Sequence, residues 1–294
     1  MSIAKFIEYI SFEKRFSKHT VEAYKNDLTQ FTEYIKSDHL IGSPAECNHL
    51  PIRSWIVKMM EEGISPRTVN RKITTLKTFY KFLLKQEMVR ENPMLRIQSP
   101  KLSKRLPVFV EKDKMDMLLD KVDFGEGFEA IRDRVIIEMF YATGMRLSEL
   151  VNLKDSDIDF YGSTVRILGK RNKERLVPFG NSLKHLIEKY KGQKKSVKIP
   201  IRDGYFFIKE DGKPLYQKMV YRLVNKYLNK VTTIDKKSPH ILRHTFATHM
   251  LNNGADLNSI KELLGHTNLS ATQIYTHNTV EKLKNVHKQA HPKA

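Results

Sequence analysis

The stretch Pro239-His240-Ile241-Leu242-Arg243-His244 is the densest cluster of reactive polar side chains in the chain. Proline is well tolerated at the first position of a helix, so the stretch predicts a helix that begins here. In that helix His240 and Arg243 stand three residues apart and share one face. A guanidinium beside an imidazole can bind a phosphate while the imidazole transfers a proton. The stretch therefore indicates chemistry on a phosphate group.

Two other interpretations of these histidines compete with this one. His240 and His244 have the i, i+4 spacing of a zinc-binding helix. However, the glutamate of the H-E-x-x-H pattern is missing, and Arg243 would place a positive charge beside any cation. We therefore expect no metal at this helix. For His244 itself we expect a buried, hydrogen-bonded position.

The residues around this stretch predict a mixed α and β domain. Residues 112–121 and 129–142 are expected to form helices, and Thr143-Gly144 ends the second. Apolar residues on both sides of the polar segment 169–173 are typical of a β-hairpin, and a second hairpin is expected within residues 205–215. From Gln217 onward the pattern predicts helices.

The first ninety residues predict a bundle of helices with basic outer faces. Ser17 is expected to cap a helix whose apolar stripe continues to Ile35, and Ser65-Pro66 opens another. A shorter helix is expected around residues 52–60. Lysines on a helix usually form a solvated face, but here they gather on one compact bundle, which favours DNA contact. The residues expected to contact DNA in this part are Arg67, Arg71, Lys72 and Lys77.

Residues 92–110 differ in composition from the chain on either side. Three prolines interrupt any helix, and no acidic residue is present. We expect a basic linker over residues 91–107, between a domain of residues 1–90 and a second domain of residues 108–294. A linker that crosses a phosphate backbone has this composition, and so does an ordinary hinge. The linker residues expected to touch DNA are Lys101, Lys104 and Arg105.

Composition narrows the class of partner. The chain has 294 residues, of which 40% are hydrophobic, so it can bury substantial cores. Its formal net charge of +19 points to a polyanion, either nucleic acid or an anionic membrane surface. No apolar run approaches the roughly 20 residues that span a bilayer, and the first residues do not resemble a signal peptide. The single cysteine, Cys47, suits a reducing cytoplasm. We therefore expect a cytoplasmic protein that binds nucleic acid rather than membrane.

Four further motifs accompany Pro239–His244. Residues 143–150 read Thr-Gly-Met-Arg-Leu-Ser-Glu-Leu and residues 169–175 read Gly-Lys-Arg-Asn-Lys-Glu-Arg; Leu264-Gly265-His266 and Tyr275 follow the central stretch. Tyr275 alone would be taken for a packing residue, because a phenol is a weak nucleophile until it is activated. Together and in this order, the five motifs resemble the tyrosine recombinase (phage integrase) family. The resemblance extends to residues 17–31 and to the tail 287–294, and it is closest to the XerC and XerD subgroup.

The resemblance implies a role for each cationic motif residue. Arg146 and Arg243 would stabilise the charge on the non-bridging oxygens of a phosphodiester, to which guanidiniums bind in a bidentate manner. Lys170 would protonate the leaving 5′ oxygen. Lys173 and Arg175 are neighbouring cations that would touch DNA or remain ordinary surface charges. Arg171 stands where many relatives have glycine, so the backbone of this loop is expected to differ from theirs.

The remaining motif residues complete the implied reaction. His240 would act as a base toward the nucleophile, and His266 would donate a hydrogen bond to the phosphate. Tyr275 would attack the phosphorus and form a 3′-phosphotyrosine. Because that bond preserves the energy of the phosphodiester, no cofactor, ATP or metal is expected.

The resemblance also implies a fold and partners. The fold would be mainly α with small β-hairpins (α+β), with a helical core-binding (SAM-like) domain and a catalytic domain that clamp duplex DNA. The implied partners are a specific recombination site, a related recombinase in a homo- or hetero-tetramer, and a septal DNA translocase acting in chromosome-dimer resolution. The tail 286–294 would dock on a neighbouring protomer, unless it is a frayed terminus. The alternatives are an integrase or invertase of a mobile element, a type IB topoisomerase, and a non-catalytic DNA-binding relative.

Overall fold

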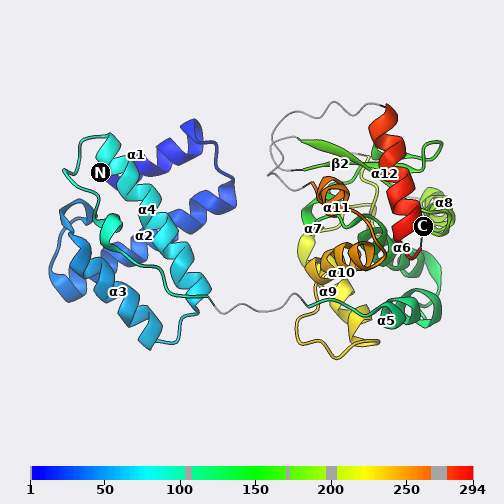
Figure 1. The fold of residues 1–294 in the computed structure, drawn as a ribbon, viewed down its shortest axis with the longest axis horizontal. Coiled ribbons are helices and arrows are strands. Elements are labelled where there is room, and N and C mark those ends of the chain that lie inside the picture. Colours follow the sequence, from blue (N-terminus) through cyan, green and yellow to red (C-terminus); the bar gives the residue numbers. More distant parts are fainter. Residues whose placement is uncertain (1, 103–107, 170–172, 197–203, 266–276, 294) are drawn as a thin grey trace. The chain divides into compact units, whose positions relative to one another are not determined.

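The computed structural model of the chain describes residues 2–102, 108–169, 173–196, 204–265 and 277–293, with the side chains of residue 196 and residues 277–282 left out. The chain divides into two compact units, Met1–Arg105 and Leu106–Ala294, and each has its own hydrophobic core (Figure 1). Among the helices described, none is both long and apolar enough to cross a membrane.

The first unit is built from helices. Its elements are α1 (Ser2–Glu8), η1 (Tyr9–Glu13), α2 (Lys18–His39), η2 (Pro44–Glu46), α3 (His49–Glu61), α4 (Pro66–Lys85) and η3 (Pro93–Arg96). The predicted start of two helices is confirmed: the hydroxyl of Ser17 accepts the amide of Thr20, and that of Ser65 accepts the amide of Thr68. Each serine thus satisfies an amide that has no partner inside the helix.

Aromatic side chains fill the core of the first unit. Phe6 of α1 is fully buried and meets Phe79 of α4 edge-on, with ring centroids 5.2 Å apart. Phe31 of α2 lies 5.0 Å from Trp55 of α3. Burial of a large apolar side chain stabilises a fold by about 1.5–3 kcal/mol. These contacts therefore hold α1 against α4 and α2 against α3.

Part of the expected linker belongs to the first unit. Pro93–Arg96 forms the 3₁₀ turn η3, which contacts α3 and α4. Met94 and Ile97 are buried in the first core, and the side-chain amide of Asn70 donates to the carbonyl of Pro100 over 2.9 Å. The expectation of a linker that starts at residue 91 is therefore wrong, because the apolar residues of this segment pack on the helices.

A buried carboxylate joins α2 to α4. Asp27 is 2% exposed and accepts hydrogen bonds from Arg71, from Lys72 (3.1 Å) and from the hydroxyl of Thr75 (2.8 Å). Lys72 is itself 5% exposed and also donates to Gln30. The expectation that Lys72 contacts DNA is therefore wrong, because its ammonium group points into the unit and is paired there.

Replacing Asp27 by Asn should destabilise the first unit by about 3 kcal/mol, because the buried ammonium of Lys72 loses its charged partner. The matched control is Asp38→Asn, which breaks an exposed ion pair with Lys58 and should have a far smaller effect. Urea unfolding followed by tryptophan fluorescence reports on this unit alone, because Trp55 is the single tryptophan of the chain. Equal losses in the two variants would contradict the role of Asp27.

The second unit combines helices with a three-stranded sheet. Its elements are α5 (Lys112–Asp116), η4 (Met117–Lys121), α6 (Gly127–Thr143), α7 (Leu147–Val151), η5 (Asp155–Asp157), β1 (Ile158–Asp159), β2 (Thr164–Leu168), β3 (Glu174–Pro178), α8 (Asn181–Ser196), α9 (Gln217–Asn229), α10 (Pro239–Asn252), α11 (Leu257–Leu264) and α12 (His277–Ala290). The sheet is antiparallel in the order β1-β2-β3. The mainly helical fold expected from the sequence is confirmed.

The predicted hairpin is present as β2 and β3. Val165 pairs with Val177, and the amide of Gly169 donates to the carbonyl of Lys173 over 2.8 Å. The turn residues 170–172 lie outside the described residues. The second predicted hairpin is reduced to a single bridge between Ile208 and Pro214, since no strands extend from it in the described residues.

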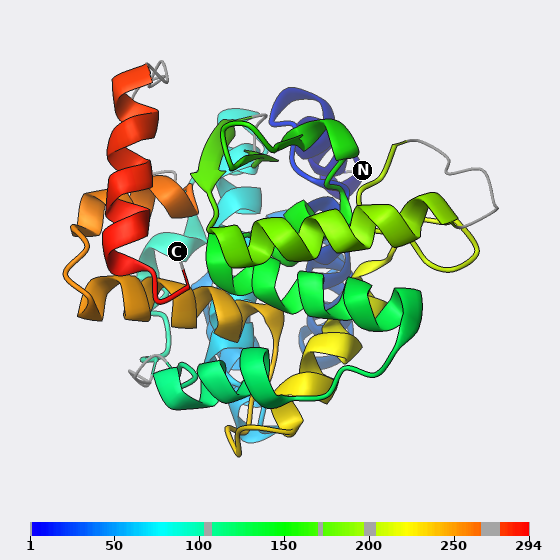
Figure 2. The same ribbon diagram turned by 90° about the vertical axis from the view of Figure 1, so that its right-hand side faces the viewer.

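Helix α6 lies at the centre of the second unit. Every residue from Val135 to Thr143 is buried, so this part of the helix is enclosed on all sides. It packs against α8 and α10, and α8 lies in front of it in Figure 2. The C-terminal end of α6 is therefore firmly held. Arg146 follows this end in the chain, and Arg243 donates a hydrogen bond to it.

The C-terminal tail packs against its own unit. Helix α12 contacts β3, α10 and α11 (Figure 2). His287 and His291 are 2% and 4% exposed, and their Nε2 atoms lie 2.9 and 3.0 Å from the carbonyl oxygens of Ala142 and Tyr141. The two imidazoles are stacked, with centroids 4.7 Å apart. The tail is therefore part of the core of this unit and not a frayed terminus.

Burial, together with the neighbouring His287 and His249, lowers the pKa of His291 to about 3, and the hydrogen bond to Tyr141 only partly opposes this shift. Its unfolded pKa is about 6.5. The folded state favours the neutral form of His291. The resulting contribution to the free energy of unfolding is present above pH 6.5 and is lost as the pH falls toward 3.

Glutamine at position 291 keeps a hydrogen-bond donor but does not titrate. His291→Gln should therefore reduce the slope of the free energy of unfolding against pH by up to about 1.4 kcal/mol per pH unit. Unfolding of the second unit, followed by circular dichroism between pH 4 and 8, measures the slope. The exposed His185 of α8, replaced in the same way, should leave the slope unchanged. Identical slopes in wild type and His291→Gln would show that another group titrates.

Candidate active site

Arg243 lies between the ends of two helices. Pro239 occupies the first turn of α10, as predicted, and places Arg243 one turn later on a buried face. The side chain is 7% exposed; its Nη1 donates to the carbonyl of Gly144 over 2.6 Å and its Nη2 to that of Leu264 over 2.7 Å. These carbonyls belong to the C-terminal ends of α6 and α11, where helix carbonyls lack intrahelical partners. Arg243 thus joins the two ends.

Arg146 stands beside this junction and is more open to solvent. It precedes α7, and its side chain is 26% exposed. Nη1 donates to Glu149 over 2.8 Å, and Nη2 lies 3.4 Å from the carbonyl oxygen of Gly265. The structure therefore brings Arg146 and Arg243 to the same short segment, Leu264-Gly265. That segment directly precedes His266.

Glu149 holds this cluster together. Its Oε1 accepts from Arg146 (2.8 Å) and Arg175 (3.0 Å), and its Oε2 accepts from the backbone amide of Arg146 and from Arg175, each over 2.7 Å. Burial alone would raise the pKa of Glu149, but the bonds from Arg175 and Arg146 outweigh it and lower the pKa to about 2. We assigned no role to Glu149 from the sequence. The signal was its position three residues after Arg146, the spacing of a capping box.

Arg175 is buried and not on a DNA-contacting surface. It is 3% exposed, and its three nitrogens donate to Glu149 and to the carbonyl of Leu263, the latter over 2.8 Å. The expectation that Arg175 touches DNA is therefore wrong. The alternation of β3 explains its position, since Val177, which points to the same side of the strand, is also buried.

The cluster has an excess of positive charge. Three guanidiniums face one carboxylate, which leaves two positive charges in a partly buried place. Burial, together with the charges of Arg146 and Arg175, lowers the pKa of Arg243 to about 9, while Glu149 opposes this shift. An anion that binds here would relieve this repulsion, and guanidiniums bind phosphate oxygens in pairs. The cluster is therefore suited to a phosphate group.

Two glycines make this arrangement possible. Gly144 and Gly265 end α6 and α11 with φ angles of +59° and +64°. A Cβ on Gly144 would lie 2.6 Å from Phe246 and 2.7 Å from Leu264, and one on Gly265 would lie 3.0 Å from Cδ of Arg175. The left-handed backbone and the close packing both require glycine at Gly144.

Both histidines of the central stretch are exposed. His240 lies in the first turn of α10, on the same side as Arg243 but open to solvent. The expectation that His244 is buried is wrong, because it points outward from α10.

Three predicted catalytic residues, Lys170, His266 and Tyr275, lie outside the described residues. Gly169, which precedes Lys170, and Gly265, which precedes His266, are described. A Cβ on Gly169 would lie 3.8 Å from Oε1 of Glu149, and Gly265 contacts Arg146 and Arg175. The segments that carry Lys170 and His266 therefore start next to the arginine cluster.

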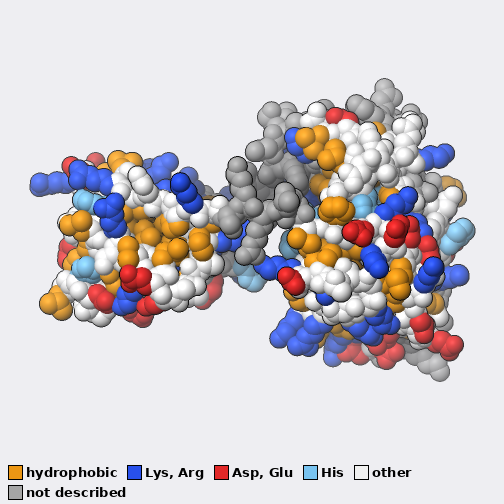
Figure 3. Space-filling view, turned by 60° about the horizontal axis from the view of Figure 1, so that its bottom comes forward, with side chains coloured by type: hydrophobic (Ala, Val, Ile, Leu, Met, Phe, Trp, Pro, Cys, Tyr) orange, Lys and Arg blue, Asp and Glu red, His pale blue; other side chains and the backbone are white. Residues whose placement is uncertain are grey.

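The remaining candidates for DNA contact are exposed wherever they are described. Basic and acidic side chains are interspersed over the surface shown in Figure 3, so net charge alone does not define a DNA-binding face. Lys104 and Arg105 lie outside the described residues. The exposed candidates are Arg67, Arg71, Lys77, Lys101 and Lys173, of which Arg71 also pairs with Asp27.

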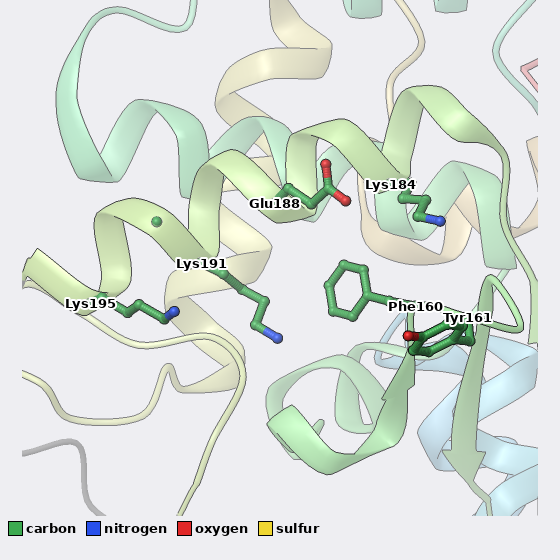
Figure 4. Close-up of a pocket in the computed structure, with 7 residues that line it drawn as sticks. Phe160, Tyr161, Lys184, Glu188, Lys191 and Lys195 are labelled. Carbon is green, nitrogen blue, oxygen red and sulfur yellow. The ribbon is translucent and has the colours of Figure 1, made fainter.

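A separate pocket of about 520 Å³ lies between α8 and the turn that joins β1 to β2 (Figure 4). Lys184, Lys191 and Lys195 line it together with Phe160 and Tyr161, and the Lys191 ammonium lies 4.4 Å from the centroid of the Phe160 ring. Its aromatic residues precede β2, whereas the arginine cluster lies near the other end of that strand. The pocket is therefore not part of the candidate active site.

The arginine cluster, which is suited to an anion, lies in the mixed unit of a chain that also has a helical unit. The chain belongs to the phage integrase family, whose profile matches residues 109–282. The profile of the phage integrase N-terminal SAM-like domain matches residues 3–87. The resemblance noted from the five motifs is thereby confirmed.

Curated relatives agree with this assignment. The tyrosine recombinase XerC of Staphylococcus carnosus is 38% identical over 98% of this chain and 96% of its own length. The tyrosine recombinase XerC of Oceanobacillus iheyensis is 39% identical over 99% of this chain and 96% of its own.

Two solved structures share the fold. XerH recombinase in a post-cleavage complex with its difH substrate has a TM-score of 0.74 at 23% identity, covering 90% of this chain and 78% of that one. The Tn1549 transposon integrase in complex with transposon right end DNA has a TM-score of 0.73 at 22% identity, covering 97% and 99%.

Replacement of Gly144 by Ala should destabilise the second unit by about 3 kcal/mol, through the strained φ angle and the collision with Phe246. Gly192 of α8 is the control, because an added Cβ there meets no atom within 4 Å and alanine favours the helix. Circular dichroism would report the loss, while the fluorescence transition of Trp55 in the first unit should not move. A fully stable Gly144→Ala protein would refute the packing argument.

Proposed function

We propose that this tyrosine recombinase cleaves and rejoins duplex DNA through Tyr275 and resolves chromosome dimers at cell division. The observation that carries the proposal is the arginine cluster. Arg146 and Arg243 both bind the backbone of Leu264-Gly265, the start of the segment in which His266 and Tyr275 follow. Phosphate-binding groups and the expected nucleophile are thus connected by a short piece of chain.

The proposed reaction resembles that of type IB topoisomerases. The hydroxyl of Tyr275 attacks the phosphorus and loses its proton to His240, and the bond from phosphorus to the 5′ oxygen breaks. Lys170 gives a proton to that oxygen, and a 3′-phosphotyrosine remains. Arg146 and Arg243, with His266, stabilise the charge on the non-bridging oxygens. Rejoining reverses these steps, so the balance needs no further reactant.

The proposed partners follow from the basic surface and from the relatives. Arg67, Lys77, Lys101 and Lys173 would bind phosphates of a duplex that carries a recombination site. Exchange of strands between two duplexes requires a protomer at each of four cleavage positions, hence a tetramer with copies of this chain or a related recombinase. A septal DNA translocase would then activate the assembly, as the resemblance to the XerC and XerD subgroup implies.

A second candidate is the integrase or invertase of a mobile element. The fold shared with the Tn1549 transposon integrase favours it, since the same scaffold serves both tasks. Mapping of all genomic sites bound by the protein distinguishes the two. A single site near the replication terminus is expected for dimer resolution, and inverted promoters or element ends would instead indicate the second candidate.

Replacement of Tyr275 by Phe should abolish covalent protein–DNA adducts on a nicked duplex that carries a mapped site. DNA affinity should change less than about twofold, because only the attacking oxygen is removed. The control is Tyr161→Phe, the same chemical change at a fully exposed tyrosine, which should form adducts at the wild-type rate. Adducts formed by Tyr275→Phe would assign the nucleophile elsewhere.

A further inference from the structure

We propose that Arg175 is a positioning residue that sets the geometry of the catalytic arginines and of the segment leading to His266 and Tyr275. The proposal rests on the proposed function and adds a residue to it. Arg175 was expected at the DNA surface, but it is a buried member of the cluster and would not touch the substrate.

Arg175 is the point at which three catalytic segments meet. It lies on β3, in the hairpin whose turn carries Lys170, and pairs in register with Ile167. Its Nη1 and Nη2 donate to both oxygens of Glu149, which in turn orients Arg146. Its Nε donates to the carbonyl of Leu263, at the end of α11. One planar group therefore connects the hairpin, the first catalytic arginine and the approach to the nucleophile segment.

The guanidinium is required for its shape as well as for its charge. Its three nitrogens donate to two partners, to the two oxygens of Glu149 and to the carbonyl of Leu263, and a lysine offers a single nitrogen in their place. Lysine would conserve the buried positive charge opposite Glu149. It would leave at least one of these acceptors without its donor, which is costly inside a protein.

The stem of Arg175 also packs against Gly265. A Cβ on that glycine would lie 3.0 Å from Cδ and 3.2 Å from Nη1 of Arg175. Gly265 is in the left-handed conformation and its carbonyl faces Arg146. A change in the position of Arg175 would therefore alter the direction in which the chain leaves α11. Small displacements of this kind reduce catalysis by about 100-fold even when they arise outside the reacting groups.

The test compares Arg175→Lys and Arg175→Met with wild type in single-turnover cleavage of the nicked duplex. The matched control is Arg166→Lys, an exposed arginine on β2 of the same hairpin that pairs with Asp157. We expect both Arg175 variants to bind DNA within about threefold of wild type, with the rate constant of cleavage lowered about 100-fold for the lysine variant. Arg166→Lys should cleave at the wild-type rate.

The amplitude of the reaction separates positioning from stability. A variant that merely unfolds in part loses amplitude, because fewer molecules are active, and keeps its rate constant. Positioning lowers the rate constant at full amplitude. If Arg175→Met fails to fold, the lysine variant alone decides. Loss of amplitude without loss of rate in that variant would overturn the proposal.

A substrate with a bridging 5′ sulfur separates Arg175 from Lys170. Sulfur leaves without needing a proton, so this substrate should rescue Lys170→Ala. It should not rescue Arg175→Lys, whose defect concerns Arg146 and the segment after Leu263. Full rescue would show that Arg175 acts through the hairpin alone and would overturn the proposal. Absence of adducts from wild type would instead reject the proposed function, so the two failures are distinguishable.

Discussion

The second unit depends on one buried carboxylate among three guanidiniums. Without Glu149, three positive charges would stand close together in a partly buried place, where water screens them poorly. With it, Arg146 and Arg175 are held by four hydrogen bonds, and two positive charges are left over. That remainder is what a phosphodiester can neutralise. Glu149 thus reduces the repulsion among the guanidiniums so that the cluster can fold. It leaves two positive charges that a phosphate can neutralise.

The first unit also contains a buried carboxylate with basic partners, but there the carboxylate joins two helices. Asp27 also gathers two basic side chains, but Lys72 is fully enclosed and the set joins α2 to α4. No phosphate is needed to complete it, because a hydroxyl and a lysine satisfy the remaining oxygen lone pairs. The two clusters differ in their number of cations: Asp27 has two basic partners, whereas Glu149 lies among three guanidiniums.

Local signals in the sequence predicted much of this structure. Ser17 and Ser65 cap helices where expected, since capping depends on residues within one turn. Arg146 and Arg243 were predicted as catalytic residues from their motifs, and the structure brings both to Leu264-Gly265. Lys72 and Arg175 were misplaced because their polarity matches that of true surface residues, and their partners lie 45 and 26 residues away. Pairing at such distances is a property of the tertiary fold, and it leaves no pattern in the neighbouring sequence.

The tail that lies against α6 has a consequence for assembly. His287 and His291 hold the tail in a binding site, its socket, on α6 of the same unit. The rest of α12 tethers the tail to that unit. A tethered segment occupies its socket as if present at roughly millimolar concentration. The tail of another molecule cannot compete with it in dilute solution. An exchange of tails between protomers would thus be confined to molecules already held side by side, as two protomers bound to one DNA duplex would be.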